Sequence, residues 1–93
     1  MNLQNIASYI MVAVKVFFFA STREQTGKTE LNIELTGEDK STTALLKLLV
    51  EMYPNLEATA ANLTLAINKK YTREDVKLKD GDEIALLPPI SGG

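Results

Sequence analysis

Hydrophobic and polar positions alternate in four stretches of the chain, and one stretch of helical spacing lies between them. Residues 12–20 are rich in β-branched and aromatic side chains, and residues 29–35 alternate aliphatic with polar side chains. Both patterns predict strands, and the polar segment around Gly27 predicts a longish loop between them. We expect the two strands to pair as an antiparallel hairpin, the second with one face in water.

One core-facing helix is predicted over residues 42–53, where leucine, methionine and tyrosine recur at helical spacing. Ser41 is the expected N-cap, because its hydroxyl can accept a hydrogen bond from an amide of the first turn. Pro54 disfavours helical backbone at the residue before it, so the helix should end near Met52 or Tyr53. No residue of this helix indicates a functional site.

The rest of the sequence predicts two further strands. Residues 63–68 alternate apolar and polar side chains, and residues 82–87 follow the strong turn signal Asp80-Gly81. The alanine-rich residues 55–62 predict a short helical turn. The order strand, strand, helix, strand, strand predicts an α+β domain with a mixed sheet packed on one main helix. The strands that flank the helix are expected to be joined through a parallel crossover.

The two ends of the chain differ from the region between them. We predict an N-terminal extension over residues 1–11, a domain over residues 12–87 and an extended C-terminal tail over residues 88–93. Two prolines, Pro88-Pro89, hold the tail extended, and Gly92-Gly93 forms a narrow, flexible tip whose carboxylate is its reactive group. We expect this tip to enter the active site of another protein.

Composition narrows the possible functions. The 93 residues are 45% hydrophobic and 24% charged, with a net charge of −2, as in an ordinary globular domain. The absence of cysteine removes thiolate chemistry, and the absence of histidine removes the usual general base and the commonest metal ligand. We therefore expect no metal site and no independent catalysis. Three lysines, Lys28, Lys40 and Lys47, are interpreted as solvated charges.

The charge pattern also argues against two classes of partner. Basic residues are scattered along the chain rather than gathered into a stripe, which disfavours nucleic-acid binding. The apolar run over residues 6–19 is broken by Lys15 and is shorter than the ~20 residues that a membrane span needs. We expect a cytoplasmic protein that binds neither nucleic acid nor membrane.

Phe17 and Phe19 give the first strand a second apolar face. This face is either covered inside the domain or forms an apolar patch for a partner protein. We predict that Phe19 and Leu87, the latter at the foot of the tail, lie at the apolar centre of a partner interface. Arg23 either pairs with a partner carboxylate or is an ordinary loop charge.

The order of elements and the diglycine tail together resemble the ubiquitin-like β-grasp proteins. Within them the chain is most similar to the MoaD-type sulfur carriers, the small subunits of molybdopterin synthase, over residues 12–93. The similar segments are residues 14–20, Arg23-Glu24 with Gly27, Ala66-Ile67-Asn68 and, most specifically, the joined sequence DGDEIALLPPISGG at residues 80–93. The segment before Met11 and the basic turn Lys69-Lys70 depart from the family pattern, and neither has an assigned role.

The resemblance implies a chemistry for the tail. In that family a ubiquitin-activating-like adenylyltransferase uses ATP to adenylate the terminal glycine, here Gly93. A sulfur donor such as a cysteine desulfurase or a rhodanese then converts it to a thiocarboxylate. The thiocarboxylate passes sulfur to cyclic pyranopterin monophosphate in the MoaE-type large subunit, which builds the dithiolene of molybdopterin. The resemblance further implies a two-plus-two heterotetramer, with a small subunit that binds no cofactor and is not an enzyme on its own.

One candidate site follows from the residues and the resemblance together. Gly93 is the expected acceptor of the adenylate and the sulfur, beside Gly92. The expected partner-binding residues are Phe17, Phe19, Arg23, Leu87, Pro88, Pro89, Ile90 and Ser91.

Three alternatives stay open at this point. The chain could be a sister sulfur carrier for thiamin thiazole synthesis or for tRNA thiolation. It could instead be a ubiquitin-like modifier conjugated to lysines through Gly93, or a plain interaction domain with an inert tail. The lead-in Leu87-Pro88-Pro89 favours the molybdopterin branch.

Overall fold

A computed structural model describes residues 11–89, which contain a five-stranded mixed sheet in the order β2-β1-β5-β3-β4. The strands are β1 (Val12–Phe18), β2 (Glu30–Leu35), β3 (Thr64–Ile67), β4 (Lys70–Thr72) and β5 (Glu83–Leu87). The central pair β1 and β5 is parallel, whereas β1–β2, β3–β5 and β3–β4 are antiparallel. The predicted hairpin of the first two strands is confirmed.

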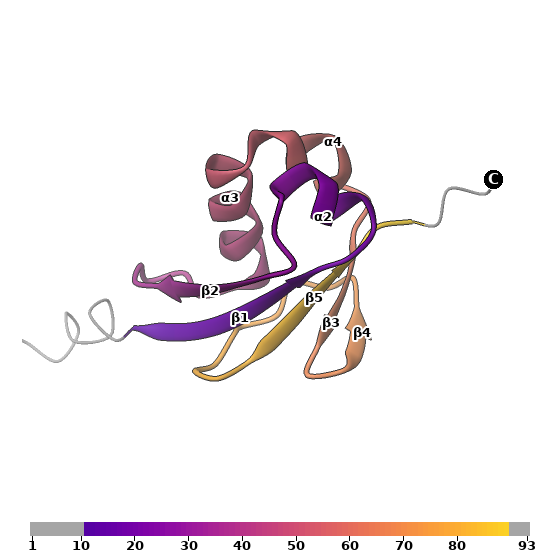
Figure 1. Cartoon of the computed structure of the whole chain (residues 1–93). Coiled ribbons are helices and arrows are strands. Elements are labelled where there is room, and N and C mark those ends of the chain that lie inside the picture. The colour runs from indigo at the N-terminus through magenta and orange to yellow at the C-terminus, as the bar shows by residue number, and fades with distance from the viewer. Residues whose placement is uncertain (1–10, 90–93) are drawn as a thin grey trace, which may run out of the picture.

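The helices within residues 11–89 lie over one face of this sheet (Figure 1). The longest is α3 (Thr42–Met52), and shorter turns are α2 (Ser21–Thr26), η1 (Pro54–Leu56) and α4 (Glu57–Ala60). The Ser41 hydroxyl accepts a hydrogen bond from the Ala44 amide at 3.1 Å, so the predicted N-cap is confirmed. Pro54 begins the 3-10 turn that follows Tyr53, the C-cap residue of α3, which explains where the helix ends. The predicted α+β arrangement of a mixed sheet on one main helix is therefore confirmed.

The segment expected to be a loop between the first two strands contains the helix α2. It ends at Gly27, which has a left-handed φ of 73° and caps the helix by donating its N–H to the carbonyl of Arg23 at 2.7 Å. Only one residue of α2, Thr22, is buried, so the helix has no apolar stripe that a periodicity argument could detect.

The expected crossover differs in detail from the structure. The strands that flank α3 in the sequence, β2 and β3, run in the same direction, but β1 and β5 lie between them in the sheet. The two parallel strands that are hydrogen-bonded to each other are β1 and β5, so this pairing connects the N-terminal and C-terminal halves of the described domain. Lys15 to Phe18 pair in register with Glu83 to Leu86.

The core fills the space between the sheet and α3. One set of alternate side chains of β1 is buried there, and facing it are buried leucines of the helix such as Leu45 and Leu49. The remaining core residues come from every other strand except β4 and from the connecting segments: Ile33, Leu35, Leu56, Leu63, Leu65, Leu78, Ile84 and Leu86. Burial of this apolar set, at about 25 cal/mol per Å², provides the main favourable contribution to folding.

The expectation that Lys40 is a solvated charge is wrong. Its side chain is buried just before α3, and its ammonium donates a hydrogen bond to the carbonyl of Gly37. The backbone carbonyl of Lys40 also accepts from Leu78 at 2.7 Å, which ties the helix start to the segment before β5. Lys28 and Lys47 are exposed, as expected.

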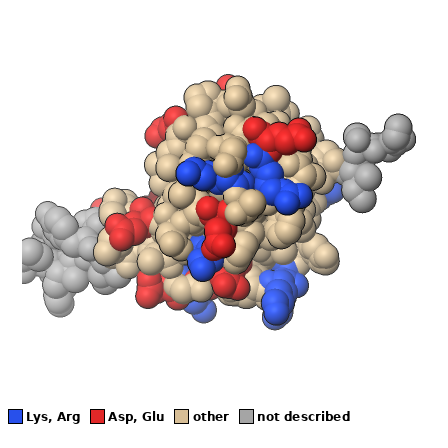
Figure 2. All heavy atoms as spheres, in the orientation of Figure 1, with Lys and Arg blue, Asp and Glu red and all other residues tan. Residues whose placement is uncertain are grey.

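The described fold runs from β1 at Val12 to β5 at Leu87. Residues 1–10 and 90–93 lie outside the described part, so the division into extension, domain and tail stays a prediction. No helix of residues 11–89 is long and apolar enough to cross a membrane. On the face shown in Figure 2, acidic and basic side chains are interspersed.

Candidate functional site

The sheet face turned away from the helices, here called the open face, is not covered by any described element (Figure 1). Its side chains are those that alternate with the core positions of each strand. On β1 this places Phe17 on the open face, with Phe19 directly after the strand. The predicted apolar second face of β1 is therefore present, and no part of residues 11–89 buries it fully.

The register explains the shape of the open face. Phe17 lies beside Ala85, Ala85 beside Ala66, and Ala66 beside Tyr71, so one row crosses four strands. The two central positions of this row have only methyl groups, whereas the two outer positions have aromatic rings. Small side chains between large ones hollow the surface of the sheet.

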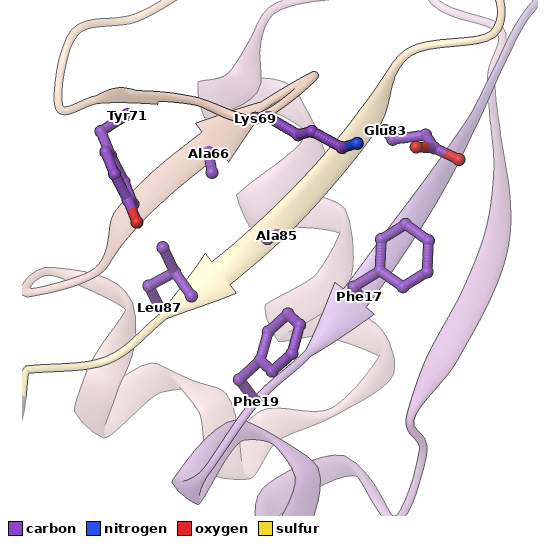
Figure 3. A pocket seen from close by; sticks show the side chains of 8 residues that line it. All are labelled: Phe17, Phe19, Ala66, Lys69, Tyr71, Glu83, Ala85 and Leu87. Atoms are coloured by element: carbon purple, nitrogen blue, oxygen red, sulfur yellow. The ribbon is translucent and has the colours of Figure 1, made fainter.

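The result is a hollow of about 410 Å³. We call it the apolar hollow, and its lining residues are Phe17, Phe19, Ala66, Lys69, Tyr71, Glu83, Ala85 and Leu87 (Figure 3). Most of the lining is hydrocarbon, and the ends of the hollow differ. Leu87 and Phe19 lie where β5 leads toward the C-terminus, whereas Lys69 and Glu83 lie at the opposite end.

Phe19 is held at its position by a compact hydrogen-bonded turn. The buried hydroxyl of Thr22 accepts from the Phe19 N–H at 2.8 Å and donates to the Phe19 carbonyl at 2.7 Å. Between them Ala20 has a positive φ of 50°, a conformation that a side chain disfavours. Phe19 as a residue is 44% exposed, which is unusual for so large an apolar side chain.

The charged end of the hollow contains both signs. Its lining includes Lys69 and Glu83. Outside the lining, Lys15 of β1 and Glu30 of β2 lie diagonally across the open face and form an ion pair at 3.3 Å in which both side chains are exposed to solvent. Such a pair contributes about 0–1 kcal/mol, so it shapes the surface charge more than the stability. Lys69 points across the face toward Glu83 without an ion pair within the described residues.

The structure brings three of the predicted partner-binding residues together: Phe17, Phe19 and Leu87 all line the apolar hollow. Arg23 is exposed on α2 and does not line it. Pro88 is half-buried and Pro89 exposed directly after β5. The remaining predicted site residues, Ile90, Ser91, Gly92 and Gly93, lie outside the described residues.

Sequence reasoning missed the rest of the lining. Ala66 and Ala85 carry no chemical signal, and their part in the hollow follows only from the register that places them between two aromatic side chains. The sequence contained one signal for this hollow: each of the two strands has an alanine among larger aliphatic side chains, at a position that faces away from the core. Tyr71 is 77% exposed, and its place on the short strand β4 could have marked it as a surface aromatic.

The apolar hollow combines a mostly hydrocarbon lining with charged groups at one end. Within residues 11–89, no group of three or more acidic, cysteine or histidine side chains is placed to hold a metal ion. An apolar surface with a few charges at one end is typical of an interface.

Comparison with known proteins decides the family. The ThiS family model matches residues 16–93. The chain belongs to the ThiS family. Its curated relatives include a molybdopterin synthase sulfur carrier subunit of Chlamydomonas reinhardtii, 40% identical over 82 residues, which cover 86% of this chain and 98% of that protein. The sequence-based assignment to the MoaD-type carriers is confirmed by this relationship.

Solved structures agree on the fold. A molybdopterin converting factor subunit 1 of Pyrococcus furiosus matches with a TM-score of 0.74 at 30% identity, covering 85% of this chain and 99% of that one. The small archaeal modifier protein 1 of Methanosarcina acetivorans gives 0.72 at 32% identity, covering 90% and 99%. A complex of subunits 1 and 2 of molybdopterin-converting factor from Helicobacter pylori gives 0.57 at 26%, covering 88% and 100%. The predicted ubiquitin-like β-grasp fold is confirmed.

Proposed function

We propose that this chain is the sulfur carrier subunit of a molybdopterin synthase, with Gly93 as the acceptor and donor of sulfur. The observation that carries the proposal is the match to molybdopterin synthase sulfur carrier subunits along nearly their full length. The open face supports it, because its apolar hollow lies at the foot of the segment that leads to Gly93. A cytoplasmic location belongs to the same proposal.

The proposed chemistry begins by activating a poor electrophile. A carboxylate oxygen of Gly93 attacks the α-phosphorus of ATP on an adenylyltransferase, which gives the acyl adenylate and pyrophosphate. A persulfide of the sulfur donor displaces AMP, and a thiol reduces the resulting acyl disulfide to release the thiocarboxylate. The small subunit provides the acyl group throughout, whereas its partners provide ATP binding and sulfur.

The second half of the cycle takes place on the large subunit. The sulfur of the thiocarboxylate bonds to a carbon of cyclic pyranopterin monophosphate as a C–O bond at that carbon breaks, and the oxygen leaves as water or with the phosphate group. Water then cleaves the acyl–sulfur bond of the resulting thioester, which restores the Gly93 carboxylate and leaves the sulfur on the pterin. Two such transfers supply the two sulfur atoms of the dithiolene. Glycine at positions 92 and 93 suits this task, because a Cβ would widen the segment that must enter the active site.

Docking of the large subunit on the open face offsets the entropy of inserting the tail. Ordering each tail residue costs roughly 1–2 kcal/mol of backbone freedom, and Pro88 and Pro89 reduce that cost by restricting φ beforehand. Phe19 and Leu87 are the proposed apolar centre of the interface, and a large aromatic anchor in a water-excluded position typically contributes most of the binding energy. The solved complex of subunits 1 and 2 of molybdopterin-converting factor from Helicobacter pylori supports the proposal that the partner is a large subunit.

The test is sulfur transfer with purified components. We would convert Gly93 to the thiocarboxylate, verify it by mass, add the large subunit and the pterin precursor, and measure dithiolene formation. A chain lacking Gly93 is the control. Product from the full chain alone is the expected result.

Absence of product with a verified thiocarboxylate and a competent large subunit would overturn the proposal. Thiamin or tRNA sulfur delivery would then be tested with the same loaded chain. Isopeptide adducts of Gly93 on lysines of other proteins would instead identify a modifier.

A further inference from the structure

The basic turn between β3 and β4 has a conformation that lysine disfavours. Asn68 and Lys69 are the two loop residues of this hairpin, and their φ values are 51° and 74°. A two-residue hairpin turn with positive φ at both positions favours Asn-Gly, because glycine has no Cβ to clash. Lysine at the second position is therefore strained, and strained residues cluster at functional sites.

Asn68 fixes this turn against the start of β5. Its side-chain amide donates to Asp82 Oδ1 at 2.8 Å, and its Oδ1 accepts from the Glu83 N–H at 2.9 Å. Its backbone N–H also donates to the Glu83 carbonyl at 2.8 Å. Three hydrogen bonds thus hold the residue that precedes Lys69, so the position of Lys69 on the open face is set by the fold.

The Lys69 side chain lies along one end of the apolar hollow. Figure 3 shows it crossing the open face toward Glu83, at the end of β5 opposite Leu87. Four residue steps of strand separate those ends, which is about 13 Å. The neighbouring cation on this face, Lys15, already pairs with Glu30, whereas Lys69 forms no ion pair within the described residues.

We propose that Lys69 pairs with a carboxylate of the large subunit at the rim of the open face and so fixes how the partner seats. This inference rests on the proposed function. A hydrophobic interface alone does little to fix the orientation of the partner. A charge at the rim of the interface favours one orientation and speeds association. With apolar contacts at the Leu87 end and a cation about 13 Å away, the partner has two separated points of attachment along β5.

Lys70 provides a matched control. It is the next residue and is also exposed, but it pairs in the ladder with Ile67, a core-facing position, and lines a different hollow beside Val76. Lys69→Glu and Lys70→Glu therefore change the net charge equally on opposite faces of one hairpin. A third variant, Lys69→Gly, removes the ammonium and relieves the positive φ.

The experiment measures binding of each full-length variant to the large subunit at about 50 mM and about 500 mM salt. We expect Lys69→Glu to bind about 3- to 10-fold more weakly at low salt, mainly through slower association, and to approach wild type at high salt. Lys70→Glu should stay within about twofold at both salt concentrations. Lys69→Gly should melt at a higher temperature than wild type and still bind about 2- to 5-fold more weakly.

In Lys69→Gly the melting temperature is expected to rise while the affinity falls. This combination distinguishes a role of Lys69 in recognition from a merely structural role. Equal binding by Lys69→Glu and Lys70→Glu, or unchanged affinity of Lys69→Gly, would overturn the role of Lys69 while leaving the proposed function intact. If wild type itself fails to bind a competent large subunit at low salt, both inferences fall together.

Discussion

At the scale of single residues, the open face depends on a buried hydroxyl. Thr22 has no exposed surface, and its oxygen is both acceptor and donor to the backbone of Phe19. The pairing satisfies two polar backbone groups beside the strained Ala20, so it holds the chain where β1 turns into α2. The position of the exposed Phe19 side chain therefore depends on the buried side chain of Thr22.

We expect Thr22→Val to lower the free energy of unfolding by about 1–3 kcal/mol, because an isosteric methyl leaves the Phe19 N–H without its acceptor. Thr22→Ser retains the hydroxyl and should lose only about 1 kcal/mol, for one buried methyl group. Urea denaturation of both variants checks this. Equal losses in the two variants would show that packing, not the hydroxyl, holds the turn.

Residue types in the sequence predicted part of the site at this scale. Phe17 and Phe19 were predicted from the second apolar face of the first strand, and Leu87 from its place at the foot of the tail. Ala66 and Ala85 were not predicted, because an alanine in a sequence does not indicate whether it lies in a core, on a surface or in a hollow. Only the pairing of strands distant in the sequence gives these alanines a role.

At the scale of elements, the start of α3 is joined to the segment before β5. Thr42 donates its N–H to the Val76 carbonyl at 2.8 Å, and its hydroxyl accepts from the Val76 N–H at 3.0 Å. Asp75 accepts from the hydroxyl and the N–H of Thr43 at 2.7 and 2.9 Å, and from the Thr42 hydroxyl at 3.0 Å. An anionic side chain at a helix N-terminus is also favoured by the helix dipole.

These contacts predict a pH-dependent stability. The hydrogen bonds from Thr43 hold the pKa of Asp75 below its usual value of 3.8. A carboxyl with a depressed folded pKa stabilises the fold above its unfolded pKa, and that contribution is lost as pH falls through the folded pKa. The melting temperature of wild type should exceed that of Asp75→Ala by a constant margin above about pH 5, and the margin should shrink below pH 3.8. A margin independent of pH down to about pH 2 would contradict the prediction.

Elements with a strong period were predictable, and those without one were not. The hairpin and α3 follow from alternation, helical spacing and the cap at Ser41. The helix α2 has six mostly polar residues, so its formation depends on Thr22 and Gly27 rather than on a periodic stripe. The parallel pairing of β1 with β5 joins residues far apart in the chain, and no local pattern encodes that pairing.

At the scale of the whole molecule, one sheet separates two surfaces with different tasks. One face packs on the helices and stabilises the fold, whereas the open face keeps its aromatic and aliphatic groups exposed (Figure 1). Leaving Phe19 in water costs hydrophobic free energy that a partner can recover on docking. The molecule thus offers a comparison between two residues of similar exposure, Phe19 at 44% and Met52 at 45%, the latter at the end of α3.

We expect Phe19→Ala to weaken binding of the large subunit by about 10-fold or more, because it removes an anchor from the centre of the proposed interface. Leu87→Ala should act in the same direction. Met52→Ala removes an equally exposed apolar side chain on the helical side of the sheet and should leave affinity unchanged within about twofold. Titration calorimetry of the three full-length variants measures these affinities.

Comparison of Phe19→Ala with Met52→Ala distinguishes the two explanations for an exposed aromatic group. If both variants bind like wild type, Phe19 is a scattered surface apolar residue of the ordinary kind, and docking uses another part of the molecule. If both weaken binding equally, the loss reflects the general stability of the domain, which urea denaturation would reveal. A loss confined to Phe19 and Leu87, with unfolding changed by less than about 1 kcal/mol, places the energy of docking on the open face.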